Sequence, residues 1–346
     1  MLKTAIVILN WNGVHFLRDF LPGVINNSVT SETKVFVADN GSSDDSISFI
    51  KELLEDEYII KLDKNYGFAL GYKLALEKIK AEYFVLLNSD VEVTENWIKP
   101  VIGLMEKDQN IAASMPKIKS FDNRNYFEYA GGAGGFIDKF GYPFCRGRII
   151  TEIEIDKGQY DDVCQIFWAT GACLFVRSAT YFEVGGLDGD FFAHMEEIDL
   201  CWRINNAGYK VIVQPAVTVY HVGGGTLPNN NPRKIYYNFR NSLFMLYKNL
   251  PGKNFKRTLL FRLTLDGFAA LKFLLTGQIP FFMAVIKAHT HFWISLRNLE
   301  KKRKFVKTLI ADKRAFQPSP VFLLTSFFIK KRKTFNDLTN IKSSNV

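Results

Sequence analysis

The chain has 346 residues, of which 47% are hydrophobic and 23% are charged. This globular composition excludes wholesale disorder and allows one large domain or two. The net charge of +9 is uneven, because residues 251–346 hold 19 Lys and Arg against 4 Asp and Glu, and residues 1–250 hold 25 against 31. We therefore predict a mildly acidic domain at 1–250 and a basic C-terminal region at 251–346. The four cysteines have no C-x-x-C spacing, and the N-terminus enters a strand pattern without a signal peptide, so a reduced, cytoplasmic protein is expected.

Apolar strand-like runs alternate with amphipathic helical stretches through the first 120 residues. The predicted strands are 4–10, 34–38, 58–62 and 83–87, and the predicted helices are 14–25, 44–54 and 68–79. This order is typical of an α/β fold, in which helices cover both faces of a parallel sheet. Ligands of such sheets bind beyond the carboxyl ends of the strands.

Polar clusters follow three of these strands, at 10–13, 39–44 and 88–90. Asp39 follows the last apolar residue of its strand and can accept hydrogen bonds from a base N–H or a ribose hydroxyl. A capped turn explains the rest of that cluster. The oxygen atoms of 88–90 suit a hard divalent ion whose shell a substrate phosphate completes, although the tripeptide is also an ordinary turn sequence. We expect one ligand site at this edge of the sheet.

Glycines mark three further segments. Gly67 lies in the run 65–71 and permits close backbone approach to a ligand, although glycine also serves helix packing. The run 130–135 lacks the Lys-Ser/Thr of a P-loop and predicts a turn or loop. His221 precedes glycines at 223–225. A lone histidine is more often structural, but a nearby phosphate and metal ion would favour a binding role.

An acidic segment at 191–203 predicts the first turns of a helix. At the helical period, Glu196, Asp199 and Arg203 share one face. We interpret Asp199 and Arg203 as an i,i+4 pair at a helix N-terminus whose acids suit the helix dipole. Glu197 falls on the apolar face, where loss of water on folding raises the pKa of a carboxyl group and makes it a better proton acceptor.

The C-terminal region contains two apolar, aromatic stretches, at 259–275 and 279–296. Charged or histidine residues interrupt both, so neither supplies the roughly 20 apolar residues of a spanning helix. Basic clusters at 301–304 and 330–333 favour amphipathic helices on an anionic membrane. A helical cap with a solvated basic rim is an equally good interpretation. No nucleic-acid motif accompanies the clusters, so no nucleic-acid partner is expected.

Eight motifs in this order resemble those of family 2 glycosyltransferases, close to the bacterial rhamnosyltransferase-like members that build surface polysaccharides. The motifs are 7–13, 37–42, 65–68, 86–90, 170–172, 185–188, 196–200 and His221. They cover roughly residues 4–250. The resemblance implies a GT-A fold, with a Rossmann-like nucleotide-binding half and a mixed sheet. It also implies a nucleotide-sugar donor, a divalent metal ion (Mg²⁺ or Mn²⁺) and inversion at the anomeric carbon.

The resemblance also implies roles for individual residues. Asp39 resembles the acid that contacts the nucleobase, Asp90 the last acid of the metal-binding motif, and His221 a histidine near the diphosphate and metal. In the pair Glu196 and Glu197, the second position resembles the catalytic base, which is usually Asp in relatives. Glu is one methylene longer, so Glu196 is retained as the alternative base. The expected nucleotide-binding residues are Asn10, Asn12, Asp39, Asn65, Gly67 and Ser89.

These features predict an inverting glycosyltransferase that moves a sugar from dTDP-rhamnose or a UDP-sugar to a hydroxyl of a saccharide or lipid-linked acceptor. The expected location is peripheral, on the inner face of the cell membrane. The alternative is a catalytically inactive sugar-nucleotide-binding scaffold of a polysaccharide assembly complex, but retention of both Glu197 and Asp90 argues against it. A nucleotidyltransferase or dehydrogenase is disfavoured, because 10–13 is not a glycine-rich phosphate loop.

Overall fold

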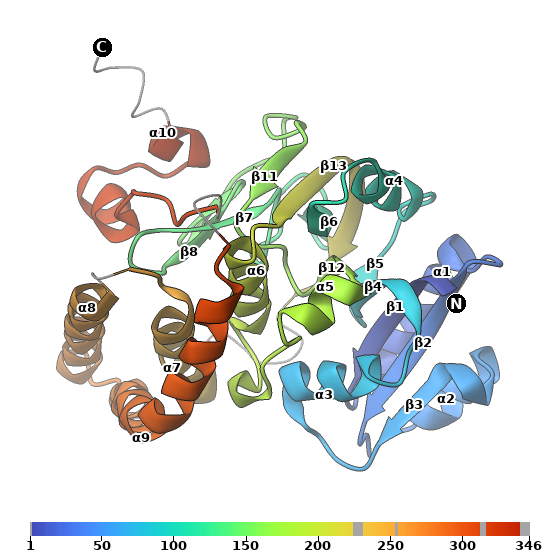
Figure 1. The fold of residues 1–346 in the computed structure, drawn as a ribbon, viewed down its shortest axis with the longest axis horizontal. Coiled ribbons are helices and arrows are strands. Elements are labelled where there is room, and N and C mark those ends of the chain that lie inside the picture. The colour runs from blue at the N-terminus through green and yellow to red at the C-terminus, as the bar shows by residue number, and fades with distance from the viewer. Residues whose placement is uncertain (1, 224–230, 253–254, 312–315, 340–346) are drawn as a thin grey trace.

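The computed structural model describes residues 2–223, 231–252, 255–311 and 316–339 (Figure 1). Its main feature is a nine-stranded mixed sheet in the order β11-β13-β6-β12-β4-β1-β2-β3, with β5 paired to β13. The strands of this sheet are β1 (Leu2–Asn10), β2 (Thr33–Asn40), β3 (Ile59–Leu62), β4 (Ala81–Asn88), β5 (Val91–Glu92), β6 (Ile111–Ser120), β11 (Cys164–Ile166), β12 (Cys173–Arg177) and β13 (Lys210–His221). A second sheet has the order β10-β9-β8-β7. Its strands are β7 (Gly135–Ile137), β8 (Pro143–Cys145), β9 (Arg148–Ile149) and β10 (Glu152–Ile153).

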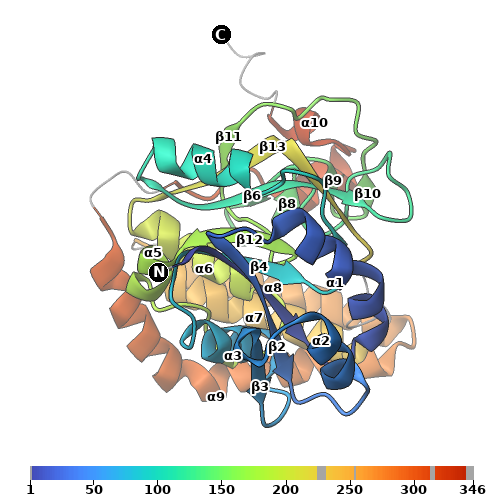
Figure 2. The same ribbon diagram turned by 90° about the vertical axis from the view of Figure 1, so that its right-hand side faces the viewer.

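Helices cover the main sheet and extend the C-terminal part of the molecule. The α-helices are α1 (Val14–Ser28), α2 (Ser46–Leu53), α3 (Gly67–Leu76), α4 (Lys99–Lys107), α5 (Ser178–Glu183), α6 (Glu196–Asn206), α7 (Pro232–Asn249), α8 (Phe255–Leu275), α9 (Ile279–Leu309) and α10 (Phe335–Thr339). Short helical turns are η1 (Asp56–Tyr58), η2 (Gly189–Phe191) and η3 (Thr325–Ile329). Figure 2 shows the N-terminal strands in front and α7, α8 and α9 behind them.

The N-terminal half of the sheet is parallel, as its sequence predicts. Strand β1 pairs in parallel with both β2 and β4, and β2 pairs in parallel with β3. The centre of β1 is fully buried, in agreement with its continuous apolar run. Strand β12 is antiparallel to both β4 and β6, which makes the sheet mixed. The predicted α/β class with a mixed sheet and a C-terminal helical region is confirmed.

The helices after residue 250 share the core of the preceding residues. Leu259, Phe292 and Leu299 are buried in the same hydrophobic cluster as the central strands. The division predicted between 250 and 251 falls between α7 and α8 and stays a prediction. Helix α9 runs past the predicted end at 296, because the basic run that follows consists of good helix formers. In the part of the chain that the structure describes, no helix is both long and apolar enough to cross a membrane.

Candidate functional site

The carboxyl ends of β1 and β2 bring three of the predicted nucleotide-binding residues together. Asn10 and Asp39 are buried register partners. Asn10 Nδ2 donates to Asp39 Oδ1 at 3.2 Å, and the backbone N–H of Ser42 donates to Oδ2 at 3.0 Å. The Ser42 hydroxyl in turn accepts from the backbone N–H of Asn12 at 2.9 Å. The carboxylate of Asp39 is therefore held in one orientation by two donors.

Asn65 and Gly67 lie at the start of α3. Asn65 Oδ1 accepts from the backbone N–H of Gly67 at 2.7 Å and from Asn40 Nδ2 at 3.2 Å, which ties this loop to the end of β2. Gly67 has φ of 75°, and a Cβ there would lie 2.5 Å from the ring of Phe192. The close approach predicted at Gly67 is thus made to Phe192, and a nucleotide-binding role for Gly67 stays a prediction.

The predicted metal ligands are neighbours at the ends of β4 and β13. Asp90 Oδ1 lies 3.2 Å from His221 Nε2, and both residues are buried. The other ring nitrogen, Nδ1, lies 3.5 Å from Glu128 Oε1. Glu128 was not predicted, since it lies 93 residues away in the chain. Ser89 is half-buried, and its hydroxyl lies 3.7 Å from where a Cβ at Gly13 would be.

The imidazole of His221 contacts Asp90 and Glu128 and is protonated near neutral pH, so it must lose a proton before it can bind a cation. Burial opposes a charge on His221, but contact with Asp90 and Glu128 raises its pKa to about 10. Burial would raise the pKa of Asp90, yet its contact with His221 lowers it. Neighbouring ligands of an octahedral ion stand about 3 Å apart, as these two donors do. Among the described residues no cluster of three His, Cys, Asp or Glu could hold a metal ion. Once the imidazole has lost its proton, Asp90 and His221 would fit an ion whose remaining positions are filled by donor phosphate oxygens and water.

Glu196 and Glu197 form the first turn of α6. Burial raises the pKa of Glu197 to about 7, so its predicted rise is confirmed. Burial and the charge of Glu197 raise the pKa of Glu196 well above its ordinary value. In each side chain Oε2 is buried without a hydrogen-bond partner among the described residues. The Cβ of Glu197 lies 3.9 Å from where a Cβ at Gly171 would be, and the next carbonyl, of Ala172, accepts from the backbone of Asn88. The segment 170–172 therefore connects the glutamate pair to the end of β4.

The segment before α6 has an unusual backbone. Phe192, His194 and Met195 have φ of 63°, 70° and 73°, a region that residues other than glycine rarely adopt. For this reason α6 begins at Glu196 rather than near 191 as predicted. Such conformations persist only where the surroundings fix them, and they concentrate at functional sites.

Helix α7 supplies the contacts that fix this segment. Asn241 is fully buried, and its Nδ2 donates to the carbonyls of Phe191, Ala193 and His194 at 3.0, 2.8 and 2.7 Å. Arg240 donates to the carbonyl of Phe191 at 2.9 Å. Sequence reasoning missed both residues. The available signal was an Asn directly before the run 242–247, which is largely apolar, because a buried amide must find hydrogen-bond partners.

The sequence of this chain is similar to that of a known protein family. Residues 5–169 match the family described as Glycosyl transferase family 2. The chain carries a family 2 glycosyltransferase domain. The match spans β1 to β11 and includes Asp39 and Asp90, whereas the glutamate pair and His221 lie beyond it.

Individual relatives support the same assignment. The N-acetylglucosaminyl-diphospho-decaprenol L-rhamnosyltransferase of Mycobacterium tuberculosis is 39% identical over 205 residues, which cover 54% of this chain and 66% of that protein. The chain thus spans just under two thirds of that relative's length. GalNAc-T7, solved with UDP, GalNAc and Mn²⁺, has a TM-score of 0.55 at 17% identity and covers 72% of this chain and 48% of that one. The mannosyltransferase PcManGT of Pyrobaculum calidifontis, solved with GDP-Man and Mn²⁺, has a TM-score of 0.51 at 13% identity, covering 89% and 85%. The two structures share the fold of this glycosyltransferase domain.

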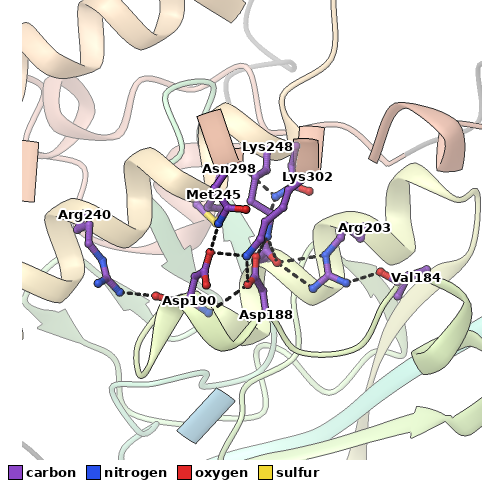
Figure 3. Close-up of polar contacts among 11 residues, drawn as sticks. Val184, Asp188, Asp190, Arg203, Arg240, Met245, Lys248, Asn298 and Lys302 are labelled. Carbon is purple, nitrogen blue, oxygen red and sulfur yellow. Dashed lines mark hydrogen bonds and ion pairs between the residues drawn. The ribbon is translucent and has the colours of Figure 1, made fainter. Parts of the chain in front are cut away.

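Ion pairs join the segment before α6 to the C-terminal helices (Figure 3). The fully buried Asp199 accepts from Arg203 at 2.8 and 3.1 Å and from Lys248 of α7 at 3.0 Å. Lys248 also pairs with Asp188, to which Lys302 of α9 donates at 2.5 Å. The predicted pair of Asp199 and Arg203 is confirmed, and Lys248 of α7 adds a further partner to Asp199.

We expect Asn241→Ala to lower the free energy of unfolding by about 1–3 kcal/mol, since a buried donor to three carbonyls is lost. The transfer rate should fall about 10- to 100-fold, because the glutamate pair follows the released segment directly. Urea denaturation and transfer kinetics measure the two effects. Asn298→Ala, which removes an exposed donor to Asp190, is the control and should change neither. An unchanged rate in Asn241→Ala would show that α7 does not position the pair.

Proposed function

We propose that this protein is an inverting glycosyltransferase that transfers a sugar from a nucleotide-diphosphate donor to a hydroxyl of a saccharide or lipid-linked acceptor. The observation that carries the proposal is Glu197, a half-buried residue whose Oε2 is enclosed without a partner among the described residues and whose pKa of about 7 suits a general base at neutral pH. It lies beside the segment that also contacts the end of β4, close to where Asp90 follows. Glu197 as the base, Asp39 as the acid that contacts the nucleoside and Asp90 as the acid that binds the metal ion would thus serve one site at the carboxyl edge of the sheet.

The chemistry requires a single displacement. The acceptor oxygen bonds to the anomeric carbon as the bond from that carbon to the diphosphate oxygen breaks, and Glu197 takes the acceptor proton. Asp39 would accept hydrogen bonds from the nucleoside. A divalent ion held by Asp90 and His221 would neutralise the charge that grows on the departing diphosphate. No covalent intermediate is needed, which agrees with a site built from one base.

A sequence relative and a solved structure support the proposed donor, and the same relative supports the proposed acceptor. The rhamnosyltransferase relative favours dTDP-rhamnose, and the structure with UDP favours a UDP-sugar. The relative's name includes a diphospho-decaprenol acceptor, which favours a lipid-linked acceptor here. Such an acceptor and the basic C-terminal helices together favour a cytoplasmic protein, peripheral on the inner face of the cell membrane.

Nucleotide binding tests the proposal first. Unfolding of the full chain is measured with dTDP, UDP, GDP and NAD, each with and without Mn²⁺. A ligand at 100 times its dissociation constant stabilises a folded protein by about 2.7 kcal/mol. We expect a Mn²⁺-dependent shift with dTDP or UDP, and loss of the Mn²⁺ dependence in Asp90→Asn. No shift with any diphosphate contradicts a donor site, and binding without turnover over many acceptors favours the inactive scaffold.

A further inference from the structure

Helices α8 and α9 extend past α7 at the end where they join each other. Tyr236, in the second turn of α7, contacts His291 with its hydroxyl oxygen 2.5 Å from Nδ1. Helix α9 begins twelve residues before His291, whereas α7 begins four residues before Tyr236. At about 1.5 Å per residue, the joined ends of α8 and α9 extend roughly 12 Å further than α7. Figure 1 shows them at the edge of the molecule, away from the N-terminal strands. We call residues 268–286 the tip.

The tip exposes an apolar surface. Phe268 is 65% exposed and Leu275 is 78% exposed, values that Leu260, Ile294 and Ile329 match outside the tip. The other exposed apolar residues of the tip are Leu271, Leu274, Ile279, Met283 and Ile286. Isolated exposed apolar side chains need no explanation, but seven of them on two joined helix ends indicate an interaction site.

The charge around the tip is almost entirely positive. Residues 266–287 contain two lysines, Lys272 and Lys287, and one acid, Asp266, whereas five of the eleven Lys and Arg of residues 255–311 lie at 301–307, near the other end of α9. Asp266 is buried and paired with Arg262, so no exposed acid of residues 266–287 balances the two lysines. Lys272 and Lys287 lie within or next to the apolar group, and their long stems allow the amines to reach lipid headgroups. This charge complements an anionic lipid surface and repels a second copy of the tip.

The tip lies at the same end of α7 as the segment before α6. Tyr237 stacks on Phe192 with ring centroids 5.4 Å apart and planes 8° apart. His291 and Lys287 of α9 contact Tyr236 in the same turn of α7. A surface that captures the tip would therefore meet the molecule on the side of the glutamate pair.

We propose that the tip inserts into one leaflet of an anionic bilayer and thereby presents the glutamate pair to an acceptor at the membrane surface. Its apolar parts, eight residues in each helix, are about 12 Å long, which suits interfacial insertion and is far less than the roughly 30 Å hydrocarbon core. The proposed membrane contact depends only on the tip. The presentation of the glutamate pair to an acceptor depends in addition on the proposed function.

Vesicle binding tests the contact. The full chain is sedimented with vesicles of phosphatidylcholine alone and of phosphatidylcholine with phosphatidylglycerol. We expect binding to the anionic vesicles, and a reduction of at least about tenfold in the double variant Leu275→Glu and Ile279→Glu. Ile329→Glu is the control, because Ile329 is 74% exposed and precedes a basic run but lies outside the tip. Equal binding of the tip variant and wild type overturns the proposal. So does a wild-type dimer that the tip variant dissociates.

Transfer assays separate this inference from the proposed function. With a water-soluble acceptor, the tip variant and wild type should have the same rate, because the changed side chains are exposed. With an acceptor anchored in anionic vesicles, the tip variant should be at least about tenfold slower. Equal rates on the anchored acceptor overturn the role of the tip. Absence of transfer in every assay rejects the proposed function, and the vesicle-binding result still decides the membrane contact.

Discussion

Glu197→Gln is expected to lower kcat by about 10²- to 10⁴-fold, the usual contribution of a general base. The amide keeps the size of the carboxyl group and removes its ability to take a proton. Donor binding should be unchanged, since the residue is assigned to the acceptor. Transfer of labelled sugar gives the rate, and calorimetry with the nucleotide and Mn²⁺ gives the affinity. Full activity in this variant would exclude Glu197 as the base.

The matched control is Glu196→Gln. Burial and the charge of Glu197 raise the pKa of Glu196 well above its ordinary value, which favours the uncharged form of this side chain. Glutamine reproduces that uncharged form, and kcat should fall less than about tenfold. If instead Glu196→Gln is inactive and Glu197→Gln is active, the roles are exchanged and Glu196 is the base.

The pH dependence has a defined sign. Because Glu197 must be ionised to act, kcat of the wild type should rise with pH through about 7 and then level off. Folding raises the pKa of this group above 4.5, so the folded state binds more protons than the unfolded state between about 4.5 and 7. The contribution of Glu197 to stability is therefore present below about pH 4.5 and is lost as pH rises through 7. The residual activity of Glu197→Gln should lack the rising limb.

The sequence predicted the N-terminal sheet because the relevant signals are local. The apolar run of β1 and the polar residues that end it identify both the strand and its carboxyl edge. Parallel pairing then brings Asn10 beside Asp39, as the register shows. Parallel pairing of β1 with β4 likewise brings Asn88 opposite Leu9, at the carboxyl end of β1.

The sequence did not reveal how the site is supported, because that support comes from distant residues. Asn241 contacts carbonyls 47 to 50 residues away, and Glu128 reaches His221 across 93 residues. The positive φ of Phe192 and His194 also has no sequence signature, since it depends on those contacts. Helical periodicity placed Glu197 on a buried apolar face, but in the structure Glu197 is half-buried and every other residue of α6 is buried.

Asp199→Asn is expected to lower the free energy of unfolding by about 3–5 kcal/mol, the penalty for leaving buried charges without their partner. The amide is the same size as the carboxylate, so the change removes charge with little loss of packing. Arg203 and Lys248 both donate to Asp199 in a fully buried position, and Lys248 then has only Asp188 to balance it. Because the ion pairs join α6 to α7, the loss should appear in global unfolding, measured by urea denaturation.

Asp190→Asn is the control for this result, because Asp190 belongs to the same group of ion pairs but its side chain is 42% exposed. Its removal should change stability by no more than about 1 kcal/mol. Burial favours protonation of Asp199, but Lys248 and Arg203 outweigh it and lower its pKa. The stability that Asp199 contributes is therefore present above about pH 4 and lost as pH falls further, a dependence that Asp199→Asn should lack. Equal effects of the two substitutions would show that the buried pairs do not hold α6 against α7.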